Sequence, residues 1–112
     1  MIQLGFLSTR ELCTLVGAPL DNAIESVLAE PDPEKRLLRV AIYNQSGCVM
    51  LRFENYCAQP VELGADGLPR HNTHGGYDLR GVQAAAQDHD GTMTLHWADG
   101  WFTLRILLPV PS

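Results

Sequence analysis

Apolar residues recur at three- and four-residue spacing from Thr9 to Ala29, which predicts one long amphipathic helix. The apolar positions of this stripe are Leu12, Leu15, Val16, Leu20, Ala23, Ile24, Val27 and Leu28. Ser8 followed by Glu11 predicts a capping box at the start of the helix. The prolines of "EPDPEK" predict its end, because proline cannot continue the hydrogen-bond ladder. Pro19 lies inside the stripe, so we expect a kink there.

Alternation of apolar and polar residues predicts four strands in two hairpins. "RLLRVAIYNQ" and "CVMLRFEN" alternate on either side of a Ser-Gly pair, with one face formed by Leu38, Val40 and Ile42 in the first strand and by Val49, Leu51 and Phe53 in the second. "TMTLHWADGWFTLRILLPV" alternates around Asp99 and Gly100, a dipeptide typical of tight hairpin turns. Trp97 and Trp101 flank this turn, and we expect them to pack against each other across the strands.

The chain between the hairpins has two parts. Residues from about 56 to 75 are polar and rich in glycine and proline, and a loop of this length in a compact domain is usually functional, so we predict a lid. In "YDLRGVQAAAQDHDG", Leu79, Val82 and Ala86 share one helical face, and Gly91 is placed to cap the helix. The order helix, strand, strand, lid, helix, strand, strand predicts an α+β two-layer sandwich, with the helices on one sheet face.

Length and charge narrow the function classes. The 112 residues fit a single domain, and 13 carboxylates against eight scattered Lys and Arg argue against nucleic acid as a partner. Three cysteines without a C-x-x-C pair predict neither a disulfide framework nor a zinc ribbon. Neither a secretion signal nor a membrane segment is apparent in this piece, so we expect a cytoplasmic location, either alone or as part of a membrane-bound sensor.

Several motifs follow one another in a specific order: "LDNAIES", "LRFENY", a polar loop, "HGGYDLRGV" and "DGWFTLRILLPVP". In this order they resemble the ATP-binding domain of sensor histidine kinases in the GHKL superfamily (Bergerat fold, HATPase_c type). More narrowly, they resemble its peptide-pheromone receptor branch. The resemblance extends from about Glu11 to Pro111. It implies a Bergerat-type ATPase fold over residues 1–112 that binds ATP and magnesium as part of a two-component system.

The resemblance also implies the residues that contact the nucleotide. Asn22 occupies the position of the asparagine that holds magnesium, a hard cation that prefers oxygen ligands. Asn55 occupies the position of the residue that accepts a hydrogen bond from the adenine amino group, which an amide carbonyl can do. The glycine box, whose backbone N–H groups approach the phosphates, aligns with Gly75, Gly76, Tyr77 and Leu79.

Three positions depart from the family pattern. Ala18 stands one turn before Asn22, where the family has asparagine, histidine or glutamate, and Pro19 follows it. Asp78 replaces the last glycine of the box, where its charge would repel phosphates. An alternative alignment keeps His74 as the histidine of the box and treats one residue as inserted. The alternatives to a working ATP-binding domain are therefore a degenerate regulatory module with weak or no nucleotide binding, and a domain similar in fold alone.

The implied partners lie outside this sequence. A histidine kinase phosphorylates a histidine on a separate dimerisation domain, and no segment here resembles that phosphoacceptor helix. We therefore expect no catalytic residue in this chain, because phosphoryl transfer depends on positioning and on a nucleophile held elsewhere. A response regulator is an indirect partner. Since dimerisation belongs to the absent helices, we expect this piece alone to be a monomer.

Overall fold

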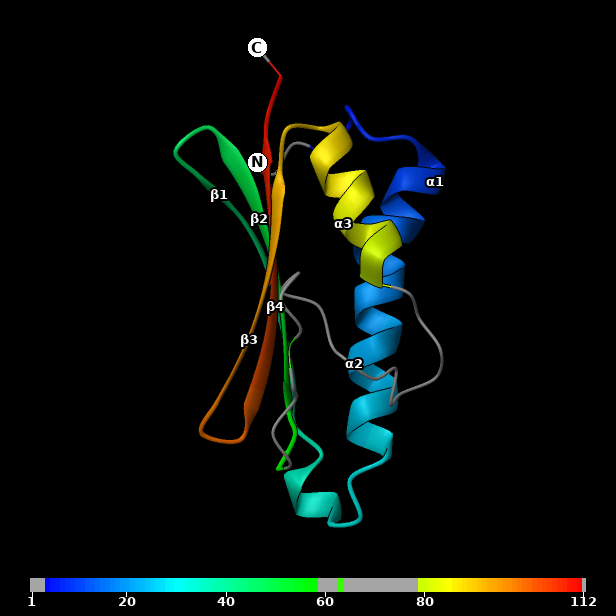
Figure 1. The fold of residues 1–112 in the computed structure, drawn as a ribbon, viewed down its shortest axis with the longest axis vertical. Coiled ribbons are helices and arrows are strands. Elements are labelled where there is room, and N and C mark those ends of the chain that lie inside the picture. Colours follow the sequence, from blue (N-terminus) through cyan, green and yellow to red (C-terminus); the bar gives the residue numbers. More distant parts are fainter. Residues whose placement is uncertain (1–3, 59–62, 64–78, 112) are drawn as a thin grey trace.

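The computed structural model describes residues 4–58, 63 and 79–111, and Figure 1 shows their arrangement. The elements are α1 (Thr9–Leu12), a π-helical turn (Cys13–Gly17), α2 (Ala18–Leu28), a 3-10 turn (Pro33–Lys35), β1 (Leu38–Gln45), β2 (Cys48–Tyr56), α3 (Leu79–Asp88), β3 (Thr92–Ala98) and β4 (Trp101–Pro109). This order confirms the predicted sequence of helices and strands. Most of the predicted lid lies outside the described residues. No helix in the described ranges is long and apolar enough to cross a membrane.

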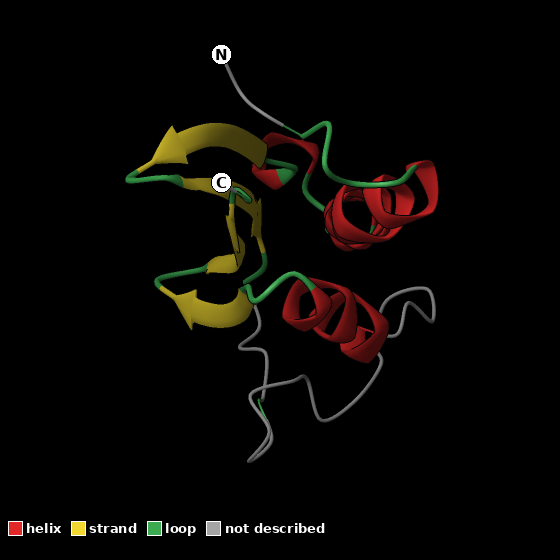
Figure 2. Ribbon diagram, turned by 90° about the horizontal axis from the view of Figure 1, so that it is seen from above, coloured by secondary structure: helices red, strands yellow, loops and turns green. Residues whose placement is uncertain are grey.

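The four strands form one antiparallel sheet in the order β1-β2-β4-β3. Figure 2 shows the helices together on one side of this sheet, which confirms the two-layer α+β architecture. Register follows the alternation of the sequence, with Phe53 of β2 opposite both Val40 of β1 and Leu104 of β4. The inward face of β2 is therefore at the centre of the molecule.

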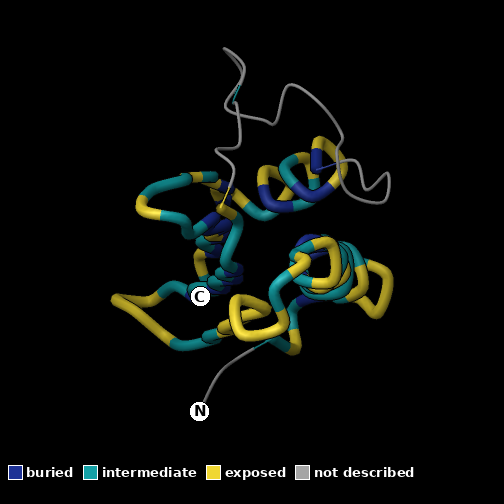
Figure 3. Tube along the Cα trace, turned by 90° about the horizontal axis from the view of Figure 1, so that it is seen from below, coloured by how far each residue is buried: buried dark blue, intermediate teal, exposed yellow. Residues whose placement is uncertain are grey.

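The hydrophobic core fills the space between the sheet and the helices. Its buried members are Leu7, Leu15, Val49, Leu51, Phe53, Leu79, Val82, Ala86, Met93, Phe102, Leu104, Ile106 and Leu108. The edge strand β1 contributes less, since Leu38 and Val40 remain 36% and 45% exposed. The apolar stripe of α2 is also wider than its contact with the sheet, because Ile24 and Leu28 are exposed. Figure 3 shows exposed and buried positions side by side on the helices. The helices cover the centre of the sheet more fully than its edge.

A π-helical turn directly precedes Pro19, where we expected a kink, and the helix continues from Thr9 to Leu28. Within that turn the N–H of Ala18 donates to the carbonyl of Cys13, five residues back. Such a turn holds one more residue than an α-helical turn and shifts the carbonyls that a proline ring would otherwise meet. The wider turn therefore lets the helix pass through proline without breaking.

The two hairpin turns are as predicted. Ser46 and Gly47 have φ of 51° and 79°, and Asp99 and Gly100 have φ of 53° and 84°. Two successive left-handed residues are the geometry of the type I′ turn, whose twist matches that of the flanking strands. Each strand pair is thus fixed in register by its turn.

The predicted packing of Trp97 against Trp101 is wrong. Trp97 lies opposite Phe102, and Trp101 lies opposite Ala98, so the two indoles point to opposite faces of the sheet. The Trp97 Nε1–H donates to the carbonyl of Cys57 at 2.8 Å, which ties β3 to the end of β2. In a hairpin with the two-residue turn Asp99-Gly100, Ala98 pairs with Trp101 and Trp97 pairs with Phe102, so the two tryptophans cannot be cross-strand partners.

The predicted role of Gly91 as a helix cap also needs correction. The left-handed residue after α3 is Asp90, with φ of 58°, and aspartate tolerates this conformation better than most residues. Gly91 is buried, and its N–H donates to the carbonyl of Ala86 at 2.8 Å. A Cβ at position 91 would lie 2.4 Å from the carbonyl oxygen of Leu107. Glycine is needed here for close approach to β4.

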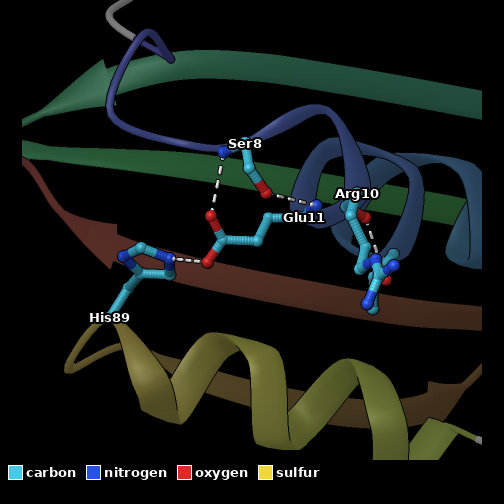
Figure 4. Close-up of polar contacts among 5 residues, drawn as sticks. Ser8, Arg10, Glu11 and His89 are labelled. Carbon is cyan, nitrogen blue, oxygen red and sulfur yellow. Dashed lines mark hydrogen bonds and ion pairs between the residues drawn. The ribbon is translucent and has the colours of Figure 1, made fainter.

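The capping box at the start of α1 is confirmed (Figure 4). The Ser8 N–H donates to Glu11 Oε1 at 2.8 Å, and the Glu11 N–H donates to Ser8 Oγ at 3.1 Å. The other carboxylate oxygen of Glu11 contacts Nε2 of His89, just beyond α3, and Phe6 packs edge-on against the same imidazole. Glu11 thereby joins the first helix to the end of the third.

These contacts predict a pH dependence of stability. The Ser8 backbone N–H, followed by the His89 ring, lowers the pKa of Glu11 from 4.5 to about 2. A carboxyl whose pKa is lower in the folded state stabilises fully above its unfolded pKa, and this stabilisation is lost as the pH falls toward the folded pKa. We expect Glu11→Gln to lower the melting temperature at neutral pH and to flatten its decline between pH 4.5 and about 2.

The matched control for this prediction is Glu34→Gln. Glu34 is exposed, so its replacement should leave both the melting temperature and its pH profile close to those of the parent protein. Melting curves followed by circular dichroism across the acidic range measure both variants. A Glu11→Gln profile that stays parallel to that of the parent protein would show that Glu11 does not titrate as stated.

Candidate functional site

Three of the predicted site residues are described, namely Asn22, Asn55 and Leu79. Gly75, Gly76 and Tyr77 lie outside the described residues, as do Asp78 and His74.

Asn55 is held in a fixed orientation at the end of β2. Its side chain is buried, with 1% of its surface exposed. The Nδ2 group donates to Ser26 Oγ at 2.9 Å and to the carbonyl of Tyr56 at 3.3 Å. Since an amide nitrogen carries two hydrogens, both are used within the protein. A ligand donor that approaches this side chain would therefore meet its carbonyl oxygen.

Ser26 connects Asn55 to α2 and thereby to Asn22. Ser26 is 8% exposed and accepts the Asn55 hydrogen bond. Asn22 lies four residues earlier, and residues at this spacing share one face of a helix. The structure thus brings Asn22 and Asn55 to one region, where α2 packs on the end of β2.

Sequence analysis did not identify Ser26 as part of the site. The sequence does contain a signal for Ser26, because this polar residue lies between the apolar positions Ala23 and Val27 of the helix stripe. A buried hydroxyl at such a position costs free energy unless it has a hydrogen-bond partner, so it points to a polar group on the facing strand. The sequence does not identify the strand residue that partners Ser26, because the partner depends on how α2 docks on the sheet.

The surroundings of Asn22 suit a divalent cation in part. Glu25 lies less than one turn after Asn22, and its Oε2 is buried without a hydrogen-bond partner in the described part of the protein. The described part of the protein contains no group of three or more His, Cys, Asp or Glu side chains that could hold a metal ion. Magnesium keeps several waters and is commonly bound by one or two protein oxygens together with phosphates. Asn22 offers one oxygen ligand, so a magnesium site here would need phosphate and water as its other ligands.

Leu79 is a core residue, with 6% of its surface exposed, and it begins α3 together with Val82 on the buried face. It therefore positions the first turn of α3 through packing. The N–H groups of that turn lack partners within the helix and favour anions. Arg80 is exposed in the same turn and adds a positive charge, a residue that sequence analysis did not single out.

Ala18 begins α2 directly after the π-helical turn and packs against the core. It offers no group that can accept a proton or orient a water one turn before Asn22. The departure noted in the sequence therefore remains in the structure, because neither a half-buried alanine nor the buried ring of Pro19 replaces a polar side chain there.

Comparisons with known proteins give one family match and a similarity to solved structures. A family model described as the GHKL domain matches residues 7–109. The curated proteins contain no match. Among solved structures, the NMR structure of the histidine kinase domain of the E. coli osmosensor EnvZ is similar at 22% identity, with a TM-score of 0.44. That alignment covers 67% of this chain and 53% of the EnvZ chain, so the present chain spans about half the length of that structure.

Proposed function

The chain belongs to the GHKL domain family, and on that premise we propose that it binds ATP with magnesium between α2, the segment of about residues 56–75 and the start of α3. The observation that carries this proposal is the Asn55–Ser26 hydrogen bond, which brings Asn22 and Asn55 to one region. In the proposed role, the domain supplies ATP for phosphorylation of a histidine on a separate dimerisation domain.

Each residue has a distinct task in this proposal. Asn22 offers its side-chain oxygen to the magnesium ion, which in turn neutralises phosphate charge. Asn55 offers its carbonyl oxygen to the adenine amino group, since its amide hydrogens are already used by Ser26 and Tyr56. The backbone N–H groups of Gly75 and Gly76, together with the first turn of α3, would contact the phosphates.

The chain's contribution to phosphoryl transfer is positioning. A fixed adenine contact and a fixed metal contact orient the nucleotide with respect to an incoming histidine. The nucleophile, the response regulator and a cytoplasmic setting belong to the same proposal, as does a monomeric state of this piece. The GHKL family match and the orientation of Asn55 support its nucleotide-binding part.

A second candidate function is a regulatory module that has weakened or lost its nucleotide. Ala18 favours it, because the position one turn before Asn22 carries no polar group and packs against the core. In this case the fold and the Asn55 contacts would persist as structural features, and binding to a partner would remain.

Isothermal titration calorimetry with ADP and with ATP, each with and without magnesium, tests the proposal. We expect micromolar affinity that depends on magnesium. In Asn22→Ala, the gain in affinity on adding magnesium should fall about tenfold or more, which corresponds to about 1.4 kcal/mol or more. Asn44→Ala is the matched control, because this asparagine is exposed and lies at the opposite end of the β1–β2 pair from Asn55.

The absence of heat, together with an unchanged melting temperature at millimolar nucleotide, would contradict ATP binding and support the regulatory module. Ala18→Asn and Asp78→Gly then distinguish the two functions further. Nucleotide affinity should rise strongly in these variants if the site is degenerate, and it should change little if the natural site already binds.

A further inference from the structure

The sheet face opposite the helices is uncovered within the described part of the chain (Figure 2). Every second residue of each strand points to this face, and the strand register fixes which residues are neighbours. We use the name outer arginine face for the residues Arg39, Tyr43, Arg52, Glu54, Trp101 and Arg105. They occupy the three adjacent strands β1, β2 and β4.

Charge on the outer arginine face is opposite to that of the rest of the chain. Arg39, Arg52 and Arg105 are countered there by Glu54 alone, so this face carries a net charge of +2. The whole chain carries −5, which leaves −7 for all other residues. An acidic protein thus concentrates three of its seven arginines on one sheet face.

Two of these arginines are placed directly against each other. Arg52 of β2 is the cross-strand partner of Arg105 of β4. Like charges at directly opposite positions destabilise a sheet, because their Cβ atoms are only about 4.5–5.5 Å apart. The stability of the isolated domain therefore does not explain the presence of both arginines.

Glu54 compensates only part of this charge. It lies 3.5 Å from Arg39 and 3.2 Å from Arg52, but the contact with Arg52 is not aligned as a hydrogen bond. The Arg52 Nε is consequently buried without a hydrogen-bond partner, and Arg105 forms no ion pair with the residues that the structure describes. Arg105 and the remaining guanidinium N–H groups of Arg52, whose side chain is 34% exposed, are therefore available to carboxylates from outside.

Aromatic rings lie against two of the three guanidinium groups, those of Arg39 and Arg52. Arg39 lies over the ring of Trp101 at 4.3 Å, and Arg52 lies 5.9 Å from the ring centre of Tyr43. Stacking on a ring holds a guanidinium plane while leaving its N–H groups at the edge free to donate. Arg, Tyr and Trp are also the residue types that contribute most to binding energy at protein interfaces.

We propose that the outer arginine face binds an acidic segment of a partner protein, whose carboxylates pair with Arg52 and Arg105. Guanidinium and carboxylate groups form bidentate hydrogen bonds, and these would relieve the like-charge contact between the two strands. A nucleic acid fits less well, because three cations are few for a phosphate backbone and Glu54 lies among them. The inference does not depend on nucleotide binding.

NMR titration of the ¹⁵N-labelled protein with a short peptide of alternating glutamate and serine tests this inference. We expect shift changes on β1, β2 and β4, and an affinity that weakens with salt. The double variant Arg52→Gln, Arg105→Gln should lose about tenfold or more in affinity, because it removes two charge-assisted contacts. The double variant Arg10→Gln, Arg36→Gln is the matched control, since both residues are exposed and lie outside the strands.

Several results would overturn the inference. Shift changes confined to the helices, or equal affinity of the two double variants, would exclude this face. Tighter binding of a single-stranded oligonucleotide or of phosphatidylserine vesicles would assign the face to phosphate ligands instead. A fall in the melting temperature of Arg105→Gln would show that this arginine stabilises the sheet, whereas we expect no change or a rise.

The test is separate from that of the nucleotide site. Asn22→Ala should bind the acidic peptide as the parent protein does, and the Arg52→Gln, Arg105→Gln variant should keep any nucleotide affinity. A parent protein that binds nucleotide but not the peptide would contradict only the inference about the outer arginine face, and one that binds the peptide but not nucleotide would contradict only the proposed function.

Discussion

Replacing Phe53 with alanine is expected to lower the free energy of unfolding by about 3–5 kcal/mol, the range for truncating a buried phenylalanine. Phe53 is 2% exposed at the centre of β2, between β1 and β4 and beneath the helices. Its loss removes buried apolar surface and leaves a cavity that neighbouring strands cannot close without losing register. Urea denaturation followed by circular dichroism measures the change.

Val40→Ala is the matched control for this truncation. Val40 lies directly opposite Phe53 on the edge strand, but 45% of its surface is exposed. Its truncation should cost less than about 1 kcal/mol, because much of the side chain remains in contact with water. Equal losses for the two variants would mean that β1 is covered by a structure that the described residues do not include.

Replacing Gly91 with alanine is expected to cost about 3 kcal/mol, at the upper end of the range of about 1–3 kcal/mol for overpacking. The added Cβ would lie 2.4 Å from the carbonyl oxygen of Leu107 and 2.8 Å from a methyl carbon of Leu108. The first of these atoms is backbone within the sheet, so relief requires α3 to move away from β4. Thermal and urea denaturation both report the loss.

Gly81→Ala is the matched control and should have the opposite sign. Gly81 lies within α3 and is exposed, and a Cβ added there would meet no atom within 4 Å. Alanine in a helix interior is favoured over glycine by about 0.5–1 kcal/mol, so this variant should be more stable than the parent protein. Destabilisation by Gly81→Ala would contradict the open space around position 81.

Local rules were sufficient to predict the elements of this fold. The helix stripe, the capping box of Ser8 and Glu11, and the Asp99-Gly100 turn each depend on residues within a few positions of one another. The role of Gly91 could not be predicted in the same way, because it depends on the distance between α3 and β4. Short-range patterns specify elements, whereas close approach between elements requires the folded arrangement.

In the candidate site, too, short-range patterns predict the individual residues but not the contacts between elements. Asn22 and Asn55 were selected because their motifs resemble a family, and the structure brings their elements together. The link through Ser26 depends on how α2 docks on β2, which periodicity does not specify. The uneven burial of the apolar stripe has the same origin, since Ile24 and Leu28 match its period but lie beyond the contact with the sheet.

We expect the π-helical turn and Pro19 to be thermodynamically coupled. Deletion of one residue from Cys13–Gly17 would restore a regular α-helix and keep both of its ends in phase, but Pro19 would then meet a carbonyl in the helix interior. If the proline alone were removed, no proline ring would clash with a regular α-helical turn, and the wider turn would no longer be needed. The two features therefore form an epistatic pair, in which the effect of losing one depends on whether the other is present.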